Sequence, residues 1–208
     1  MDGVFMRKIV KLLAVLLVLG LVLEIADLVL DKQTLRQSLI RLHVVAASDS
    51  EEDQAVKLQV RDAVIAYVDQ AMSHVMTISE AKAWLEENLL GIQNAANEVL
   101  GKLGVQHEAR VCLNEEAFPV RHYDSFSLPA GVYSALRVTI GEGQGKNWWC
   151  VVFPKLCMPV QGENTEDVAA GAGFSQELTN TVTRQEGYKV RFFFLDLLGK
   201  IENFLFGA

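Results

Sequence analysis

The chain has 208 residues, half of them hydrophobic, which suffices for the core of one domain and an additional segment. It carries 19 basic and 26 acidic residues, a net charge of −7. An acidic body without a cluster of lysine and arginine argues against nucleic acid or anionic lipid as the partner. The composition favours a protein or a neutral ligand instead.

The additional segment lies at the N-terminus. Three basic residues precede an apolar run from Leu12 to Leu23, and Glu24 ends this run. The pattern predicts a signal peptide or an N-terminal membrane anchor over residues 1–30, which inserts into a membrane at least transiently. The run is shorter than the roughly 20 residues of a comfortable span, but no A-x-A-like cleavage site is evident, so both readings stay open. Residues 31–208 are expected to form one extracytoplasmic domain.

Residues 39–46 alternate in polarity and predict a half-buried first strand, with Arg41 and His43 on its polar face. Three good N-cap residues follow at positions 48–50, before an acidic first turn. A long helix is therefore expected over about residues 51–73, with Asp53 and Lys57 four residues apart on one face.

A second helix is marked by a capping box, in which Thr77 is followed three residues later by Glu80. Apolar residues then keep a helical period up to Gly104, where a left-handed residue would end the helix. Because few residues connect the two helices, we expect them to pack as an antiparallel hairpin.

After Gly104 the hydrophobic period changes to two, which predicts strands. Strands are expected over residues 105–113, 118–123, 131–140 and 148–153. The end of the chain predicts a short strand from Tyr188 and then a helix. Apolar residues share one row of that helix, namely Phe193, Leu197, Ile201 and Phe204.

Residues 160–187 lack a clear period and predict a long loop with at most a short helix near residues 175–183. The order of elements indicates an α+β domain. Its sheet should be mostly antiparallel, with the helical hairpin and the C-terminal helix packed on it.

The stretch GEGQGK at residues 141–146 resembles a phosphate-binding loop only superficially. A Walker A loop has four residues between its glycines and a hydroxyl residue after the lysine, whereas this stretch is one residue short and Asn147 follows Lys146. It also lies between two predicted strands, so no helix N-terminus points into it. We therefore predict a tight hairpin turn.

No enzyme motif is complete, and the histidines and cysteines lack metal-ligand spacing, so neither metal nor cofactor is predicted. One polar constellation remains, where the first strand runs into the helix N-terminus: Arg41, His43, Ser48, Asp49 and Ser50. It could serve a hydrolase that uses His43, Ser48 and Asp49. Helix capping alone accounts for the serines and the aspartate equally well.

The three cysteines allow at most one internal disulfide. Cys150 and Cys157 are close in sequence, with Pro154 between them, and can pair if the domain is exported. The alternative is that both are buried free thiols.

Three blocks of the sequence resemble the stage II sporulation protein R family. They are IRLHVVAASDSEEDQAVKLQVRDAV, GVYSALRVTIGEGQGKNWWCVVFPKLC and YKVRF, and they occur in the family's order between about Leu39 and Phe192. The resemblance implies a signalling protein of endospore-forming bacteria, exported from the forespore into the space between forespore and mother cell. Its implied partner is a membrane-embedded aspartic protease of the mother-cell membrane, which it triggers to process the sigma-E precursor.

The resemblance supplies no catalytic residues and implies an activator that is not itself an enzyme. Polar positions in the matching blocks, expected to be exposed, are the candidates for binding the partner: Arg41, His43, Asp49, Asp53, Lys57, Arg61, Glu142 and Lys146. The alternatives are an extracytoplasmic hydrolase and a module that binds a small molecule or the cell wall.

Overall fold

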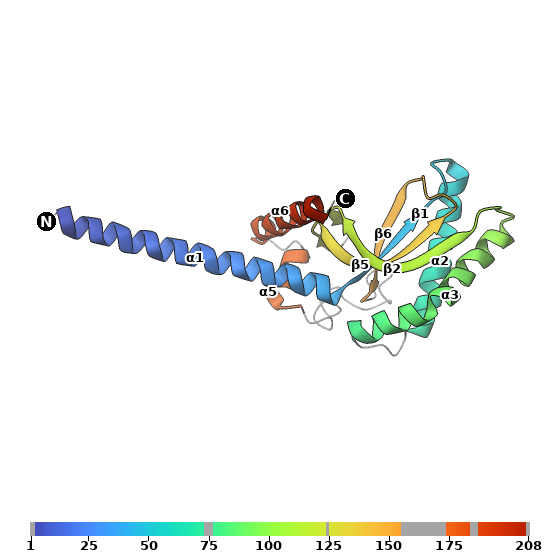
Figure 1. The fold of residues 1–208 in the computed structure, drawn as a ribbon, viewed down its shortest axis with the longest axis horizontal. Coiled ribbons are helices and arrows are strands. Elements are labelled where there is room, and N and C mark those ends of the chain that lie inside the picture. Colours follow the sequence, from blue (N-terminus) through green and yellow to red (C-terminus); the bar gives the residue numbers. More distant parts are fainter. Residues whose placement is uncertain (1–2, 73–76, 124, 155–173, 184–186, 207–208) are drawn as a thin grey trace.

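The computed structural model describes residues 3–72, 77–123, 125–154, 174–183 and 187–206. Over these residues a long helix projects from an α+β domain (Figure 1). The helices are α1 (Gly3–Ser38), α2 (Glu51–Ala71), α3 (Ile78–Lys102), α5 (Gln176–Val182) and α6 (Lys189–Phe206). The strands are β1 (Ile40–Val45), β2 (Ala109–Phe118), β3 (Arg121–His122), β4 (Ser127–Leu128), β5 (Gly131–Ile140) and β6 (Asn147–Phe153).

The main sheet has the strand order β2-β5-β1-β6. Strand β1 pairs parallel to β5 and antiparallel to β6, and β2 pairs antiparallel to β5. The short strands β3 and β4 form a separate antiparallel pair. The predicted fold class, α+β with a mostly antiparallel sheet and helices packed on it, is confirmed.

Local capping chemistry starts and ends the helices on one face of the sheet. Ser50 caps α2 and accepts a hydrogen bond from the Asp53 backbone N–H. Thr77 and Glu80 form the predicted capping box of α3, and Gly104 after this helix has a φ of 69°. These three predictions are confirmed because each depends on residues close together in the chain.

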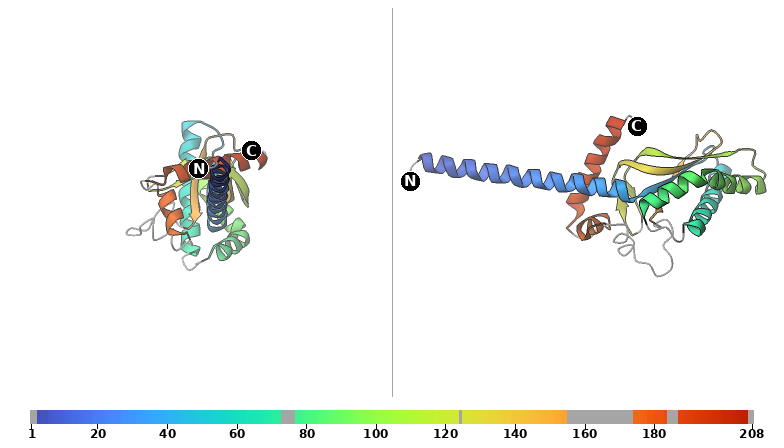
Figure 2. Two further views of the ribbon diagram at one scale, coloured as in Figure 1. Left: turned by 90° about the vertical axis from the view of Figure 1, so that its left-hand side faces the viewer. Right: turned by 60° about the horizontal axis from the view of Figure 1, so that its bottom comes forward.

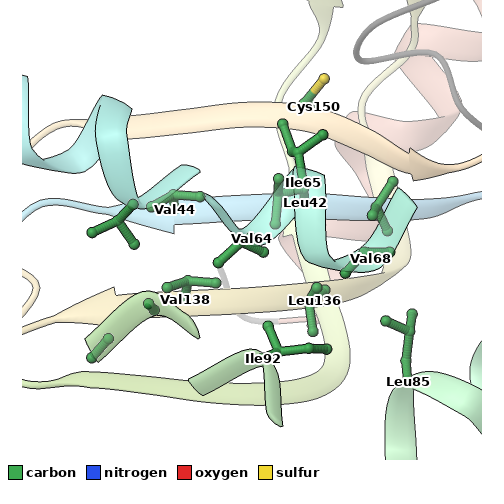
Figure 3. Close-up of a cluster of buried hydrophobic side chains, with 14 of the residues drawn as sticks. Leu42, Val44, Val64, Ile65, Val68, Leu85, Ile92, Leu136, Val138 and Cys150 are labelled. Carbon is green, nitrogen blue, oxygen red and sulfur yellow. The ribbon is translucent and has the colours of Figure 1, made fainter. Parts of the chain in front are cut away.

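Helices α2 and α3 contact each other and cover one face of the sheet. The core between these layers consists of aliphatic side chains from both helices and the central strands (Figure 3). Leu42 and Val44 of β1 lie in it together with Val64 of α2, Ile92 of α3 and Leu136 of β5.

The opposite face of the sheet is covered by the end of α1, by α5 and by α6. Leu35 and Leu39 enter this second core from the N-terminal side, and Leu178 of α5 and Leu195 of α6 enter it from the C-terminal side. Both faces of the central strands are therefore buried, and all six residues of β1 are buried. The prediction of a half-buried first strand was right about the strand but wrong about its burial.

The predicted hairpin at residues 141–146 is wrong as to topology. Gly141 and Gly143 have positive φ values of 57° and 64°, as a tight turn requires, but β5 and β6 are not neighbours. Strand β1 lies between them, so this loop crosses the end of β1. In this arrangement both edges of β1 are hydrogen-bonded, one to β5 and the other to β6.

Three other boundaries differ from the predictions. Strand β2 begins at Ala109 and continues to Phe118, so the predicted separate strand over residues 118–123 shrinks to the two-residue β3. Helix α6 begins at Lys189, where a strand was predicted from Tyr188. The short helix α5 is confirmed, capped by Ser175, and most of the predicted loop over residues 160–187 lies outside the described residues.

The apolar row of the C-terminal helix does not pack on the sheet. The buried residues of α6 are Leu195, Asp196 and Gly199, on the opposite side of the helix. A Cβ at Gly199 would collide with the Ala130 carbonyl, so the helix backbone lies directly against the start of β5. The Asp196 carboxylate accepts a hydrogen bond from the Ala130 N–H at 3.0 Å, which fixes the same contact.

This close approach predicts that Gly199→Ala destabilises the fold by about 1 to 3 kcal/mol, because the methyl group must push α6 away from Ala130. Gly101→Ala in α3 is the matched control, because a Cβ there meets nothing within 4 Å and should stabilise the helix by up to about 1 kcal/mol. Urea unfolding of the full chain in detergent micelles measures both. Equal stability of the two variants would contradict the packing described for α6.

Candidate functional site

Two loops meet at the end of β1 that lies far from α1 (Figure 1). One connects β1 to α2, and the other connects β5 to β6. The N–H groups of Gln144 and Gly145 donate to the carbonyls of Ala47 and Ala46 at 3.2 and 2.9 Å. A Cβ at Gly145 would collide with the Ser48 carbonyl, so only glycine permits this approach. The loops therefore form one continuous surface, called here the distal loop surface.

Charged side chains cover the distal loop surface. Asp49, Glu142 and Lys146 are exposed, and Asp53 is half-buried. The Asp49 carboxylate accepts a hydrogen bond from the Lys146 N–H at 2.6 Å, and the Ser48 hydroxyl donates to Asp53 at 2.5 Å. The structure thus brings together four of the residues predicted for partner binding, although positions 53 and 142 are far apart in the sequence.

Lys57 lies beneath this surface and not on it. Its side chain is buried, and its ammonium group donates to the Lys146 carbonyl at 3.0 Å and to Gln54 at 2.6 Å. Burial lowers the pKa of Lys57, and the positive charges of Lys146 and Arg61 act in the same direction, against the charge of Asp49. The expectation of an exposed Lys57 is wrong, because the amine satisfies a loop carbonyl that would otherwise lack a partner.

Arg61, one turn further along α2, is half-buried. Its guanidinium lies 4.2 Å from the centre of the Trp148 ring and pairs with Asp62. Stacking on an aromatic ring holds the arginine in place without desolvating it completely. Arg61 and the exposed Trp148 therefore extend the distal loop surface along the outer strand β6.

His43 is buried on the face of the sheet opposite the α2 and α3 helices, with 5% of its surface exposed. Its Nδ1 lies 2.6 Å from a Glu116 carboxylate oxygen, and its Nε2 lies 2.8 Å from the Asn147 side-chain oxygen. The imidazole also stacks on Trp149, with the ring centres 3.8 Å apart. Because Asn147 immediately follows the glycine loop, His43 connects this loop to the interior of the sheet.

Glu116 pairs with the side chains of His43 and Arg137. Burial by itself raises the pKa of Glu116, but the hydrogen bonds and charges of His43 and Arg137 outweigh burial and hold this pKa below its ordinary value. Arg137 donates to the second carboxylate oxygen at 3.1 Å. Each oxygen of Glu116 thus has one partner, which is the arrangement that a buried carboxylate needs in order to remain charged.

Arg41 is fully buried next to this cluster, although it was expected on the surface. Its guanidinium lies 4.1 Å from the centre of the Phe118 ring and 5.1 Å from that of Tyr133, and one nitrogen donates to the Tyr123 hydroxyl at 3.1 Å. Within the described residues its Nε and Nη1 atoms have no hydrogen-bond partner. Aromatic faces accordingly provide most of the surroundings of this charge.

The hydrolase arrangement predicted from His43, Ser48 and Asp49 is not assembled. Among the described residues, His43 bonds to Glu116 and Asn147, Ser48 bonds to Asp53, and Asp49 bonds to the Lys146 backbone. A nucleophile and its base must lie within hydrogen-bond reach of each other. These three residues instead serve separate structural contacts.

Cys150 is disulfide-bonded, and Cys112 is a free cysteine. Cys157, the partner predicted for Cys150, lies outside the described residues, so the pairing of these two cysteines stays a prediction. Likewise, no group of metal-ligating side chains occurs in the part of the chain that the structure describes.

The partners of the buried polar residues were not predicted from the sequence; they are Glu116, Arg137, Asn147, Trp149 and Tyr123. The sequence contains one indication of them. Arg137 is the one charged residue of the mainly apolar strand β5, which favours a buried acidic partner for it. The pairing of β1 with β5 is needed to recognise that His43 lies in register with Arg137.

The model of the stage II sporulation protein R family matches residues 36–162, which is more than half of the chain. The chain belongs to this family. It is also similar to stage II sporulation protein R of Bacillus subtilis (strain 168), with 31% identity over 180 residues that cover 78% of this chain and 80% of the relative. No solved structure matches it significantly.

Family membership supports a role in sporulation and confirms the resemblance seen in the sequence. The YKVRF block lies beyond residues 36–162, which the family model matches. Helix α1 is long and apolar enough, by length and composition, to cross a membrane over Phe5–Ser38. It is compatible with either a signal peptide or a membrane anchor.

The surroundings of Glu116 predict an acid-dependent stability. The pKa of Glu116 in the folded protein lies below the ordinary value of 4.5. The contribution of its ionised carboxylate to the free energy of unfolding is therefore complete above about pH 4.5 and is lost as the pH falls through the folded pKa. Glu116→Gln should lower the free energy of unfolding at pH 7 by roughly 1 to 3 kcal/mol and flatten its decrease at acid pH.

Denaturant unfolding between pH 3 and 7, roughly the range over which carboxylates titrate, measures this effect. Glu108→Gln is the control, because Glu108 is exposed and should leave the pH profile unchanged. A Glu116→Gln profile that runs parallel to the wild type would contradict the proposed charge network.

Proposed function

We propose that this protein is exported from the forespore and activates a membrane-embedded aspartic protease of the mother-cell membrane, which then processes the sigma-E precursor. Family membership supports the sporulation role. The observation that carries the proposal is the distal loop surface, a charged surface on rigid elements at the end of the domain opposite α1 (Figure 1).

The position of this surface suits a signal between two membranes. Helix α1 leads directly into β1, and β1 runs away from α1 to the distal loops (Figure 1). A domain held by α1 in one membrane would therefore present these loops toward whatever lies opposite. This geometry supports contact with a protein in the facing membrane more than contact with one in the same membrane.

The rigidity of the loops supports binding by preorganisation. The backbone of the glycine loop is bonded to the β1–α2 loop at Ala46, Ala47 and Asp49. Loops that are already ordered lose little conformational entropy when they bind, so more of the contact energy contributes to affinity. The exposed carboxylates and the Lys146 amine then supply a charge pattern that a complementary surface can select.

Activation by binding requires that the partner's active state bind more tightly than its inactive state. The activator needs no catalytic residue for this. The dispersal of His43, Ser48 and Asp49 into separate structural contacts is in keeping with such a mechanism.

Changes of charge on the distal loop surface test the proposal. Asp49→Asn keeps an oxygen that can accept from the Lys146 N–H but removes the charge, and Glu142→Lys and Lys146→Glu reverse charges whose side chains are exposed. Each should reduce processing of the sigma-E precursor in sporulating cells, and the Asp49→Asn, Lys146→Glu double variant should reduce it by on the order of tenfold.

Glu86→Gln, at an exposed position on α3, is the matched control and should process the precursor normally. The amounts of each exported variant are compared by immunoblot, so that loss of the protein is separated from loss of the signal. Normal processing by all the distal variants at normal protein levels would refute this surface.

A further inference from the structure

The exposed side of α6 is apolar along its length. Its large side chains recur every three or four residues and share one side of the helix. Their exposed fractions range from 41% for Leu197 to 82% for Phe204. This set is called here the α6 stripe: Val190, Phe193, Phe194, Leu197, Ile201, Phe204 and Leu205. An apolar patch of this kind marks a contact with a protein or a membrane.

The outward orientation of the α6 stripe is fixed by the opposite side of the helix. Asp196 and Gly199 lie against Ala130, and the Asn203 amide donates to the Phe118 carbonyl at 2.8 Å. Glu202 accepts from the Val132 N–H at 3.1 Å and pairs with Lys32 of α1 at 2.8 Å. Rotating α6 to bury its apolar side would break all of these contacts.

Helix α1 lies beside the α6 stripe. Arg191 of α6 pairs with Asp31 of α1 at 2.7 Å, at the end of α1 that joins the domain. Closer to the N-terminus of α1, the two helices enclose an apolar groove of about 630 Å³, lined by Ile25 and Leu28 of α1 and by Val190 and Phe194 of α6 among others. Val190, Phe194 and Leu197 of the stripe therefore face the apolar part of α1.

The residues of α1 at which a membrane span would end lie beside this groove. Its uninterrupted apolar run, Leu12–Leu23, is only about 18 Å long at 1.5 Å per residue, whereas a bilayer core is about 30 Å thick. Beyond Leu23 the helix stays apolar up to Leu30 except at Glu24 and Asp27. Ile25, Val29 and Leu30 are exposed. A span that includes them ends beside α6. Figure 2 shows that α6 crosses the line of α1 at a steep angle, as a helix in the membrane plane would.

We propose that α6 is an interfacial membrane helix whose stripe inserts into the leaflet surface from which α1 emerges. An 18-residue amphipathic helix with phenylalanine and leucine on one side has the chemistry for this position. Its occupant is lipid because the stripe is continuous with the apolar surface of α1, which lies in lipid when α1 is kept as a membrane anchor. The contact is apolar, so it does not need anionic headgroups, in keeping with the acidic body of the protein. This contact of α6 with the membrane is separate from the proposed function, because it does not involve the protease.

Tryptophan fluorescence tests this directly. Phe193→Trp and Phe204→Trp place a reporter on the stripe with little change in shape, and Leu90→Trp places one at an exposed position on α3, away from α1. Each full-length variant is inserted into phosphatidylcholine vesicles with brominated acyl chains, and the signal of the three native tryptophans is subtracted using the wild type. Because α1 attaches every variant to the vesicle, only the depth of the new tryptophan differs.

The expected result is that brominated lipid quenches the Phe193→Trp and Phe204→Trp emission by about half or more and leaves the Leu90→Trp emission nearly unchanged. Equal, weak quenching at all three positions would overturn the proposal. Loss of quenching together with self-association of the chain in the vesicles would also overturn it, in favour of a second copy. Far-UV circular dichroism checks that each variant keeps the helix content of the wild type, and neither result depends on protease activation.

Discussion

The structure depends on one covalent constraint, which is that a single residue, Leu39, separates the end of α1 from the first residue of β1. Strand β1 is central in the sheet and pairs with β5 and β6 on its two edges. Leu39 is itself fully buried in the core beneath α5 and α6. A movement of α1 therefore cannot be absorbed by a flexible linker and must involve the centre of the sheet. Ion pairs of Lys32 with Glu202 and of Asp31 with Arg191 also connect the last turns of α1 to α6.

This constraint explains why β1 carries charged residues into the interior. A central strand is buried on both faces, so its alternate side chains must all be accommodated. Leu42 and Val44 pack into the apolar core beneath α2 and α3, where they need no polar partner. Arg41 and His43 are buried on the other face, where their polar groups need partners. Phe118, Tyr123 and Glu116 provide them through aromatic contact, a hydroxyl and a carboxylate. The polar cluster specifies how β1, β2, β5 and β6 fit together.

Features that depend on neighbouring residues could be predicted from the sequence. The Thr77–Glu80 capping box, the left-handed Gly104 and the strand over residues 131–140 are of this kind. Features that depend on long-range pairing could not. Alternation at Arg41 and His43 indicated a polar face, and only the packing of α5 and α6 shows that this face is covered. The predicted hairpin at residues 141–146 was wrong for the same reason, since nothing in the local sequence indicates that β1 lies between β5 and β6.

The C-terminal helix illustrates a related limit. The periodicity of Phe193, Leu197, Ile201 and Phe204 correctly indicated an apolar side, but it cannot identify what covers that side. The structure assigns the packing role to the less hydrophobic side, where Gly199 permits direct contact of the backbones. An apolar row therefore predicts a partner, and the identity of that partner depends on the position of α1.

Two attachments to one membrane would restrict the domain more than α1 alone. A single spanning helix leaves the domain free to rotate about the helix axis and to tilt with it, whereas an interfacial α6 crossing that axis opposes both motions. Strand β1 has six residues, so the distal loops are held about 20 Å beyond the end of α1. The tilt of α1 would otherwise spread the positions of Asp49, Glu142 and Lys146 over a wide arc. With α6 fixed, these charges face the opposite membrane in a narrow range of orientations, which reduces the entropy lost when they bind a partner there.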